Sequence, residues 1–126
     1  FEVKISPLAV HDEAVPVKLA RMSIDKQLHG DLEATSRGEM LAMMTATQGS
    51  AGYVAIERVT GRLHGREGSF VLQHSSTMAR GVPQQSIHVI PDSGTGDLVG
   101  LSGSFVIDVR DKQHFYTFDY SLDSAK

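Results

Sequence analysis

Two titratable side chains, Glu57 and His74, are the best candidates for chemistry in this sequence. Each lies in a segment of alternating apolar and polar residues, and this pattern predicts a strand with one buried face. A carboxylate and an imidazole that share an apolar interior can remove and return a proton, because burial moves their pKa values toward neutral pH. We therefore name Glu57 and His74 as candidate catalytic residues. The alternative is a buried polar pair that satisfies itself and fixes the strand register.

An internal repeat predicts which way His74 faces. The segment 61–71 recurs, with most residues kept, as 96–106. When the copies are aligned and continued, His74 falls in the same phase as Val109, together with the apolar residues of both copies. Because an apolar phase points into a sheet's interior, His74 is expected inside and Gln73 outside.

The neighbouring segment 53–59 places Glu57 on the same interior face. Arg58 is harder to bury than Glu57, because a guanidinium cannot become neutral by losing its proton. Glu57 is therefore expected inside and Arg58 outside. The same alternation leaves Val54 and Ile56 on the outer wall, and such an apolar outer patch predicts a homodimer.

The elements that would position these residues are almost all strands. The chain has 126 residues, the length of a single domain over 1–126, and its 12 glycines divide it into short apolar stretches. The Met-rich run 39–44 is assigned to a strand because threonines and glycines flank it, and one helical turn is expected near 97–101. The predicted strands cover residues 1–9, 18–28, 34–47, 50–60, 68–78, 84–90, 102–110 and 114–121.

Eight short strands without a covering helix can form a sandwich or a barrel, and eight is the number that closes around one small cavity. The prediction is an all-β fold, a small antiparallel closed barrel. Its lumen would bind a small, largely apolar molecule, with isomerase-type or cyclase-type chemistry at Glu57 and His74. The rival hypothesis is a non-catalytic dimeric structural or interaction module whose lumen is filled by its own side chains. The residues expected to line the lumen and contact a ligand are Tyr53, Leu72, Phe105, Tyr116, Phe118 and Tyr120.

Composition and missing motifs exclude several other classes. The net charge is −3 and no basic stripe occurs, which argues against nucleic-acid or anionic-membrane partners. No apolar run reaches the roughly 18 residues of a membrane span. Cysteine is absent, the six histidines do not pair at ligand spacing, and no phosphate-binding glycine loop is present, so we expect no metal and no cofactor. A cytoplasmic location is expected.

Four stretches of the chain resemble a bacterial family of proteins of unknown function, DUF3224. They cover residues 49–59, 68–74, 91–103 and 114–120, and the strings Gly-Ser-Phe-Val-Leu-Gln-His and Ser-Gly-Thr-Gly are the most distinctive. The family is grouped with allene oxide cyclase-like β-barrels, so the resemblance implies a small, commonly dimeric barrel with no assigned activity. Glu57, Gln73 and His74 match recurrent positions of the family, which adds weight to a site in the lumen. Fold likeness carries no reaction with it.

Overall fold

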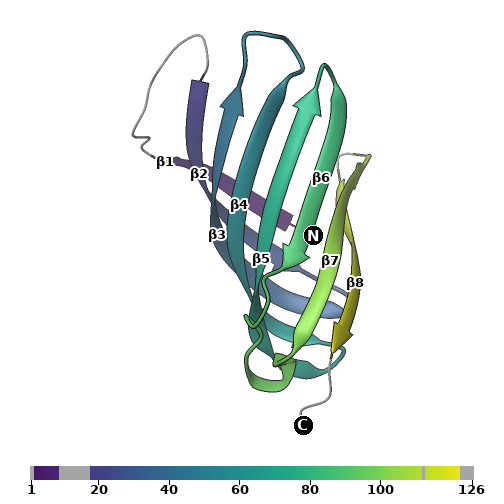
Figure 1. The fold of residues 1–126 in the computed structure, drawn as a ribbon. Coiled ribbons are helices and arrows are strands. Elements are labelled where there is room, and N and C mark those ends of the chain that lie inside the picture. The colour runs from purple at the N-terminus through teal and green to yellow at the C-terminus, as the bar shows by residue number, and fades with distance from the viewer. Residues whose placement is uncertain (1, 9–17, 112, 123–126) are drawn as a thin grey trace.

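The computed structural model describes residues 2–8, 18–111 and 113–122. Their eight strands form one antiparallel sheet in chain order (Figure 1). A single 3-10 turn, η1 (Gly96–Leu98), lies between the last two hairpins. The strands are β1 (Glu2–Leu8), β2 (Lys18–Leu28), β3 (Leu32–Met44), β4 (Ala51–Leu63), β5 (Arg66–Ala79), β6 (Val82–Val89), β7 (Leu101–Arg110) and β8 (Gln113–Leu122). The predicted all-β class is confirmed, and the Met-rich run lies in β3.

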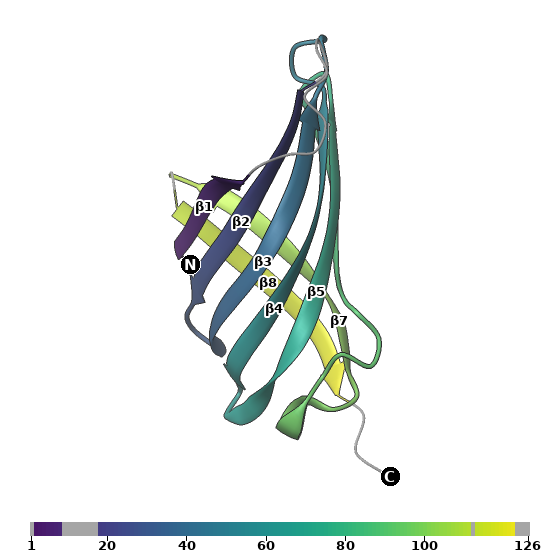
Figure 2. The same cartoon turned by 90° about the vertical axis from the view of Figure 1, so that its left-hand side faces the viewer.

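The sheet curls into an open half-barrel. Strands β2 to β5 are the longest and lie side by side, while β7 and β8 cross behind the lower part of β1 to β4 (Figure 2). The bend comes between β6 and β7, which are paired only at His88 and Ser104. Within the described residues the ladder runs from β1 to β8 and these two strands are its edges. The prediction of a closed barrel is therefore wrong.

The outer edge of β8 meets a turn instead of β1. The Tyr116 hydroxyl donates a hydrogen bond to the carbonyl oxygen of His29 (2.9 Å) and accepts one from the backbone N–H of Leu32 (3.2 Å), on either side of the β2–β3 turn. Ring contacts hold β8 at this angle: the ring centroid of Phe105 lies 5.1 Å from that of Tyr116, which stacks on it, and 5.1 Å from that of Phe118, which is tilted to it. A closed ladder would need β8 to lie along β1, which has only seven residues.

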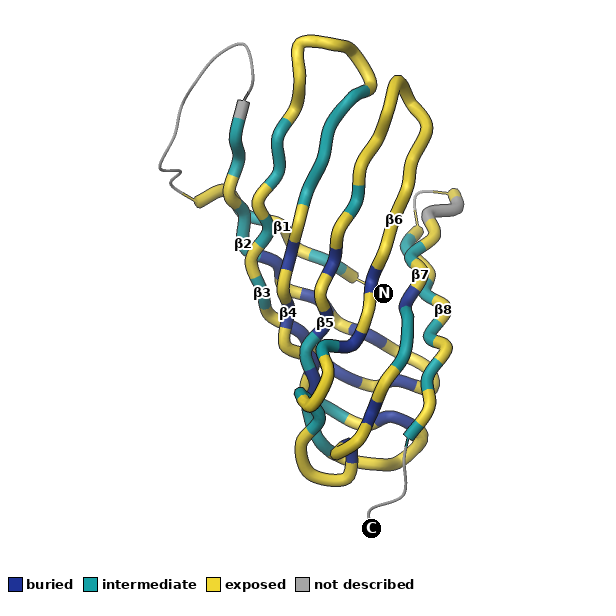
Figure 3. The backbone as a smooth tube through the Cα atoms, viewed as in Figure 1, coloured by how far each residue is buried: buried dark blue, intermediate teal, exposed yellow. Residues whose placement is uncertain are grey.

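The core is confined to the lower half, where β7 and β8 cover the sheet (Figure 3). Toward the turns that join β3 to β4 and β5 to β6, inward-facing residues are at most half-buried. We call this end the upper half. The largest fully buried apolar side chains of the lower half are Leu28, Leu32, Val59, Leu63, Phe70, Leu72, Ile87 and Leu98.

The loop before η1 continues the pairing of β5 where β6 has ended. Backbone N–H groups of Ile90 and Thr95 donate to the carbonyl oxygens of Val71 and Ser69, both at 2.8 Å. Gly68 makes this approach possible, because a Cβ at that position would overlap the carbonyl oxygen of Thr95. The glycine serves a close backbone contact here.

We predict that Gly68→Ala lowers the free energy of unfolding by about 1–3 kcal/mol, since the overlapping atom is backbone and cannot rotate away. The matched control is Gly52→Ala in β4, where the nearest atom to a new Cβ is the Ser76 carbonyl oxygen at an ordinary 3.6 Å. Urea unfolding of both variants measures the difference. Equal stability of the two variants would contradict the prediction.

Candidate functional site

A buried polar cluster is centred on the carboxylate of Glu57 in β4. Lys26 Nζ from β2 donates to both oxygens, at 3.2 Å to Oε1 and 2.9 Å to Oε2. Ser36 Oγ from β3 donates to Oε1 at 3.2 Å, and His74 Nε2 from β5 lies 3.0 Å from Oε2. Only 1% of Glu57 and 3% of His74 is exposed. Both residues lie on the inner face, and Arg58 and Gln73 are exposed, as the alternation predicted.

The register of β2, β3 and β4 explains how these side chains meet. Lys26 pairs with Ser36, and Glu57 pairs with Gly38. A Cβ on Gly38 would overlap the backbone of β4, so glycine lets β4 come close to β3. The long side chain of Lys26 reaches across β3 to the carboxylate. Sequence reasoning missed Lys26 and Ser36, although both fall in the phase of the buried Ile24 and Ala34.

The surroundings of Glu57 favour its charged form. Burial raises the pKa of this carboxyl, but the contact with His74 and the positive charge of Lys26 outweigh that cost and hold the pKa below its usual value. Glu57 is therefore negative at neutral pH. The expectation that burial would bring its pKa toward neutral is wrong, because the compensating cation was not identified.

His74 lies at the boundary between this cluster and the upper half. Its Nε2 is close to Glu57, but the ring is not oriented for a hydrogen bond. Among the described residues it is the one buried side-chain nitrogen or oxygen with no hydrogen-bond partner. The His74 ring centroid lies 6.4 Å from that of Tyr53, one row further up. This nitrogen is enclosed and lies against the carboxylate of Glu57.

The other predicted ligand contacts lie elsewhere. Leu72 and Phe105 are buried in the lower core, and the ring centroids of Phe118 and Tyr120 lie 5.2 Å apart beside it. Tyr116 holds β8 to the β2–β3 turn. Of the six predicted residues, the structure brings only Tyr53 near His74. Of the other five, Leu72 and Phe105 pack in the lower core, while Tyr116, Phe118 and Tyr120 line a pocket of about 420 Å³ there. A ligand-binding or catalytic role for any predicted residue stays a prediction.

Methionine marks the inner surface above His74. Alternation and register place Met22, Met40, Met44 and Met78 in the same inward phase as Glu57 and His74. Met22 pairs directly with Met40, and both are half-buried. We call this surface the upper inner face; its members are Ala20, Met22, Met40, Ala42, Met44, Tyr53, Ser76, Met78 and Gln85.

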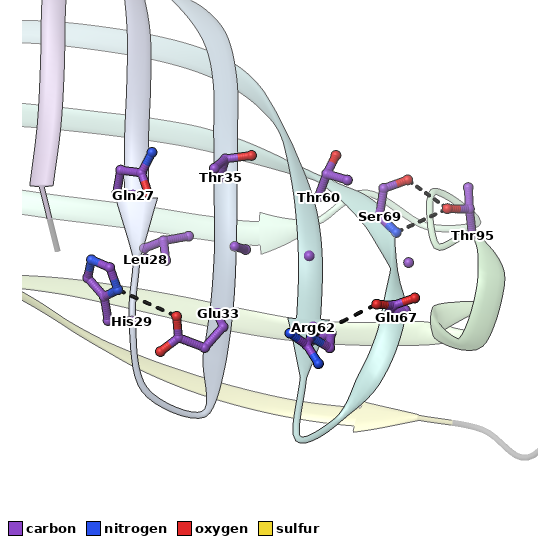
Figure 4. Close-up of a pocket in the computed structure, with 13 residues that line it drawn as sticks. Gln27, Leu28, His29, Glu33, Thr35, Thr60, Arg62, Glu67, Ser69 and Thr95 are labelled. Carbon is purple, nitrogen blue, oxygen red and sulfur yellow. Dashed lines mark hydrogen bonds and ion pairs between the residues drawn. The ribbon is translucent and has the colours of Figure 1, made fainter.

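The lower outer surface carries a polar groove of about 690 Å³ (Figure 4). Six of its side chains are paired with one another: His29 with Glu33 at 3.5 Å, Arg62 with Glu67 at 4.0 Å, and Ser69 with Thr95 at 2.6 Å. Within the described chain, no three His, Asp or Glu residues gather as a metal site would require. Nothing in this groove indicates a ligand.

A second outer groove, of about 730 Å³, crosses β2 to β5 higher up and is apolar. Its walls include Leu41, Val54 and Ile56, and the last two are 52% and 55% exposed. The ion pair between Arg21 and Glu39, at 2.6 Å, borders it. The outward placement of Val54 and Ile56 is as expected, whereas a second subunit over them stays a prediction.

Comparison with known proteins identifies the family to which this chain belongs. A family model described as "Protein of unknown function (DUF3224)" matches residues 1–120. The chain belongs to the DUF3224 family. A DUF3224 protein of unknown function from Shewanella oneidensis MR-1, solved by crystallography, is 49% identical and superposes with a TM-score of 0.95, over 98% of this chain and 93% of its own.

These likenesses assign no activity to the DUF3224 fold. None of the curated proteins matches the chain. The expected relation to allene oxide cyclase is tested by neither likeness and stays a prediction. In the part of the chain that the structure describes, no helix has the length and apolar character needed to cross a membrane.

We predict that Glu57→Gln lowers the free energy of unfolding at pH 7 by about 3–5 kcal/mol, because it leaves Lys26 buried without its counter-charge. A lowered carboxyl pKa stabilises the fold above the unfolded value near 4.5 and ceases to do so as the pH falls through the folded value. The difference in the free energy of unfolding between the parent and Glu57→Gln should therefore become smaller below pH 4.5. Thermal melts from pH 7 to pH 3 measure it, with Glu39→Gln in the exposed Arg21 pair as control. A gap that is constant with pH would refute the ionic account.

Proposed function

We propose that this DUF3224 protein binds a small, largely apolar molecule on its upper inner face, directly above the buried Glu57 cluster. The observation that carries the proposal is the gathering of four of the chain's five methionines on that face. Met44 and Met78 are 66% and 42% exposed, which is unusual for large apolar side chains. A bound apolar molecule would remove them from water.

Methionine suits such a surface for physical reasons. Its unbranched side chain and polarisable sulfur adapt to partners of different shape, and surfaces rich in methionine recur at adaptable binding sites. Ala20 and Ala42 pair with one another directly above the pair Met22 and Met40.

The proposal is one of binding, without proton transfer by Glu57. A carboxylate with a lowered pKa is a weak base at neutral pH. Its oxygens also accept hydrogen bonds from Lys26 and Ser36. In this proposal the cluster forms the lower boundary of the ligand site, and its charges are paired with one another.

We predict that Met40→Gln weakens binding of the hydrocarbon dye diphenylhexatriene by about 1 kcal/mol, or roughly fivefold, because an amide replaces apolar contact area. Met43→Gln is the matched control, since it changes the same residue type on the same strand but on the opposite face. Fluorescence titration gives both affinities, and thermal melts check that each variant is folded. Equal effects of the two changes, or a parent that does not take up the dye, would overturn the proposal.

A second candidate function is a non-catalytic interaction module that forms a homodimer. The observation in its favour is the apolar outer groove with its exposed Val54 and Ile56. Monomeric proteins seldom expose a continuous apolar patch of this kind unless it is an interaction site.

For this candidate, Ile56→Lys should convert a dimer into a monomer, because it places a charge in the middle of the apolar groove. The control is Val106→Lys on β7, which changes an equally exposed residue outside the groove. Sedimentation velocity at micromolar concentration reports the mass of each species. A monomeric parent would remove this candidate.

A further inference from the structure

We infer that a second site, separate from the upper inner face, binds a small organic cation such as a quaternary ammonium ion. It is the pocket of about 420 Å³ at the lower end of the molecule, between β8 and the turns that join β2 to β3 and β4 to β5. Pockets that hold small molecules have volumes of this order, about 300–1,000 Å³. The inference does not depend on the proposed function, because its residues lie at the other end of the sheet.

Hydrogen bonds hold the two turns of this pocket together. The backbone N–H of His64, in the β4–β5 turn, donates to the carbonyl oxygen of Asp31, in the β2–β3 turn (2.8 Å). Both central residues of the β4–β5 turn, His64 and Gly65, have positive φ (48° and 83°), as in a type I′ hairpin turn. Tyr116 adds the hydrogen bonds that join β8 to the β2–β3 turn. The backbone around the pocket is therefore fixed before any ligand arrives.

Aromatic rings of β8 form one wall of the pocket. Phe118 and Tyr120 line it with their ring centroids 5.2 Å apart, and the ring of His64, which also lines it, lies 5.8 Å from that of Tyr120. The ring of Phe118 is held by Phe70, on which it stacks at 5.7 Å, and by Phe105 at 5.1 Å. Aromatic rings attract cations because their faces carry negative partial charge, and quaternary ammonium ions are bound in this way.

The charged groups at the mouth of the pocket are mainly acidic. Asp31 is the one carboxylate among the described residues that line it, and its side chain is 80% exposed. His64 Nε2 lies 3.8 Å from the Asp31 carboxylate, while His29 lies 2.9 Å from Glu2 and 3.5 Å from Glu33. Three carboxylates thus surround two imidazoles. A cation at this mouth would meet an opposite charge, whereas an anion would be repelled.

Basic side chains do not offset this charge inside the pocket. Among the described residues, no lysine or arginine lines it. Arg66 pairs with Leu63 and therefore shares the inward phase at this end, but it is exposed and lies outside the lining. Arg62 is paired with Glu67 at 4.0 Å on the outer surface. The aromatic wall and the Asp31 carboxylate therefore favour an organic cation over an anion or a neutral molecule.

Choline and dimethylbutanol are a matched pair of probes, since carbon replaces the charged nitrogen of choline in a molecule of the same shape. The methyl signal of each probe is followed by NMR during titration of the parent at pH 8, where a histidine side chain in water is neutral. We expect choline to bind roughly fivefold more tightly than dimethylbutanol, which corresponds to one cation–π contact. Vesicles of phosphatidylcholine carry the same ammonium group on a lipid, and binding of the vesicles without binding of choline would overturn a small-molecule site.

Two variants test the parts of the site separately. Asp31→Asn should weaken choline binding roughly threefold and change dimethylbutanol binding less than twofold, because it removes only the charge. Tyr120→Leu should weaken choline binding roughly fivefold, because it removes an aromatic ring from the wall. The matched controls are Asp25→Asn and Phe115→Leu, which change exposed residues outside the lining and should leave choline binding unaltered.

Thermal melts show whether each variant is folded, and the exposed Asp31 keeps the test decisive if Tyr120→Leu unfolds the protein. The site is overturned if choline does not bind the parent or if dimethylbutanol binds as tightly. It is also overturned if Asp31→Asn affects choline no more than Asp25→Asn does. The proposed function is tested apart from this site, because uptake of diphenylhexatriene depends on Met40 at the opposite end of the sheet.

Discussion

An eight-stranded sheet with no covering helices must hide its inner face with its own strands, and here β7 and β8 do so for the lower half alone. The hydrogen bonds of Tyr116 to the β2–β3 turn fix that crossing. Below it, apolar side chains pack to full burial. Above it, the inner face of β2 to β6 continues without a second layer in the described residues, and its side chains stay half-buried. The division of the molecule into a packed half and an uncovered half follows from this one arrangement.

The buried cluster belongs to the boundary between these halves. Removing Lys26 and Glu57 from water is costly, and their attraction repays that cost only when the remaining hydrogen-bonding groups are also satisfied. Ser36 provides one such hydrogen bond, and His74 remains incompletely satisfied. Apolar side chains of similar volume at the same positions would avoid the free-energy cost of removing charges from water. The cluster therefore adds little net stability over an apolar set, although the loss of one partner alone would be costly.

Alternation alone predicted much of this arrangement. It predicted most of the strands and the inward facing of Glu57 and His74, while the flanking threonines and glycines gave the strand assignment of the Met-rich run. It failed for Lys26, because a lysine in an alternating segment is ordinarily read as solvent-exposed. The sign of the Glu57 pKa shift depended on that missing cation. Closure of the barrel failed for another reason: the Tyr116 contact joins residues that are distant in sequence, and no local pattern encodes it.

The upper part of β3 shows why an inner and an outer partner are compatible. Its period of two places Met40 and Met44 on the inner face and Leu41 on the outer face, so this stretch is apolar on both sides. Strands of that composition are normally covered on both faces. In the described residues neither face is covered here, and Met44 and Leu41 remain in water. A small molecule inside and a second copy outside would each cover a different face of the same strands, so occupation of one surface leaves the other free.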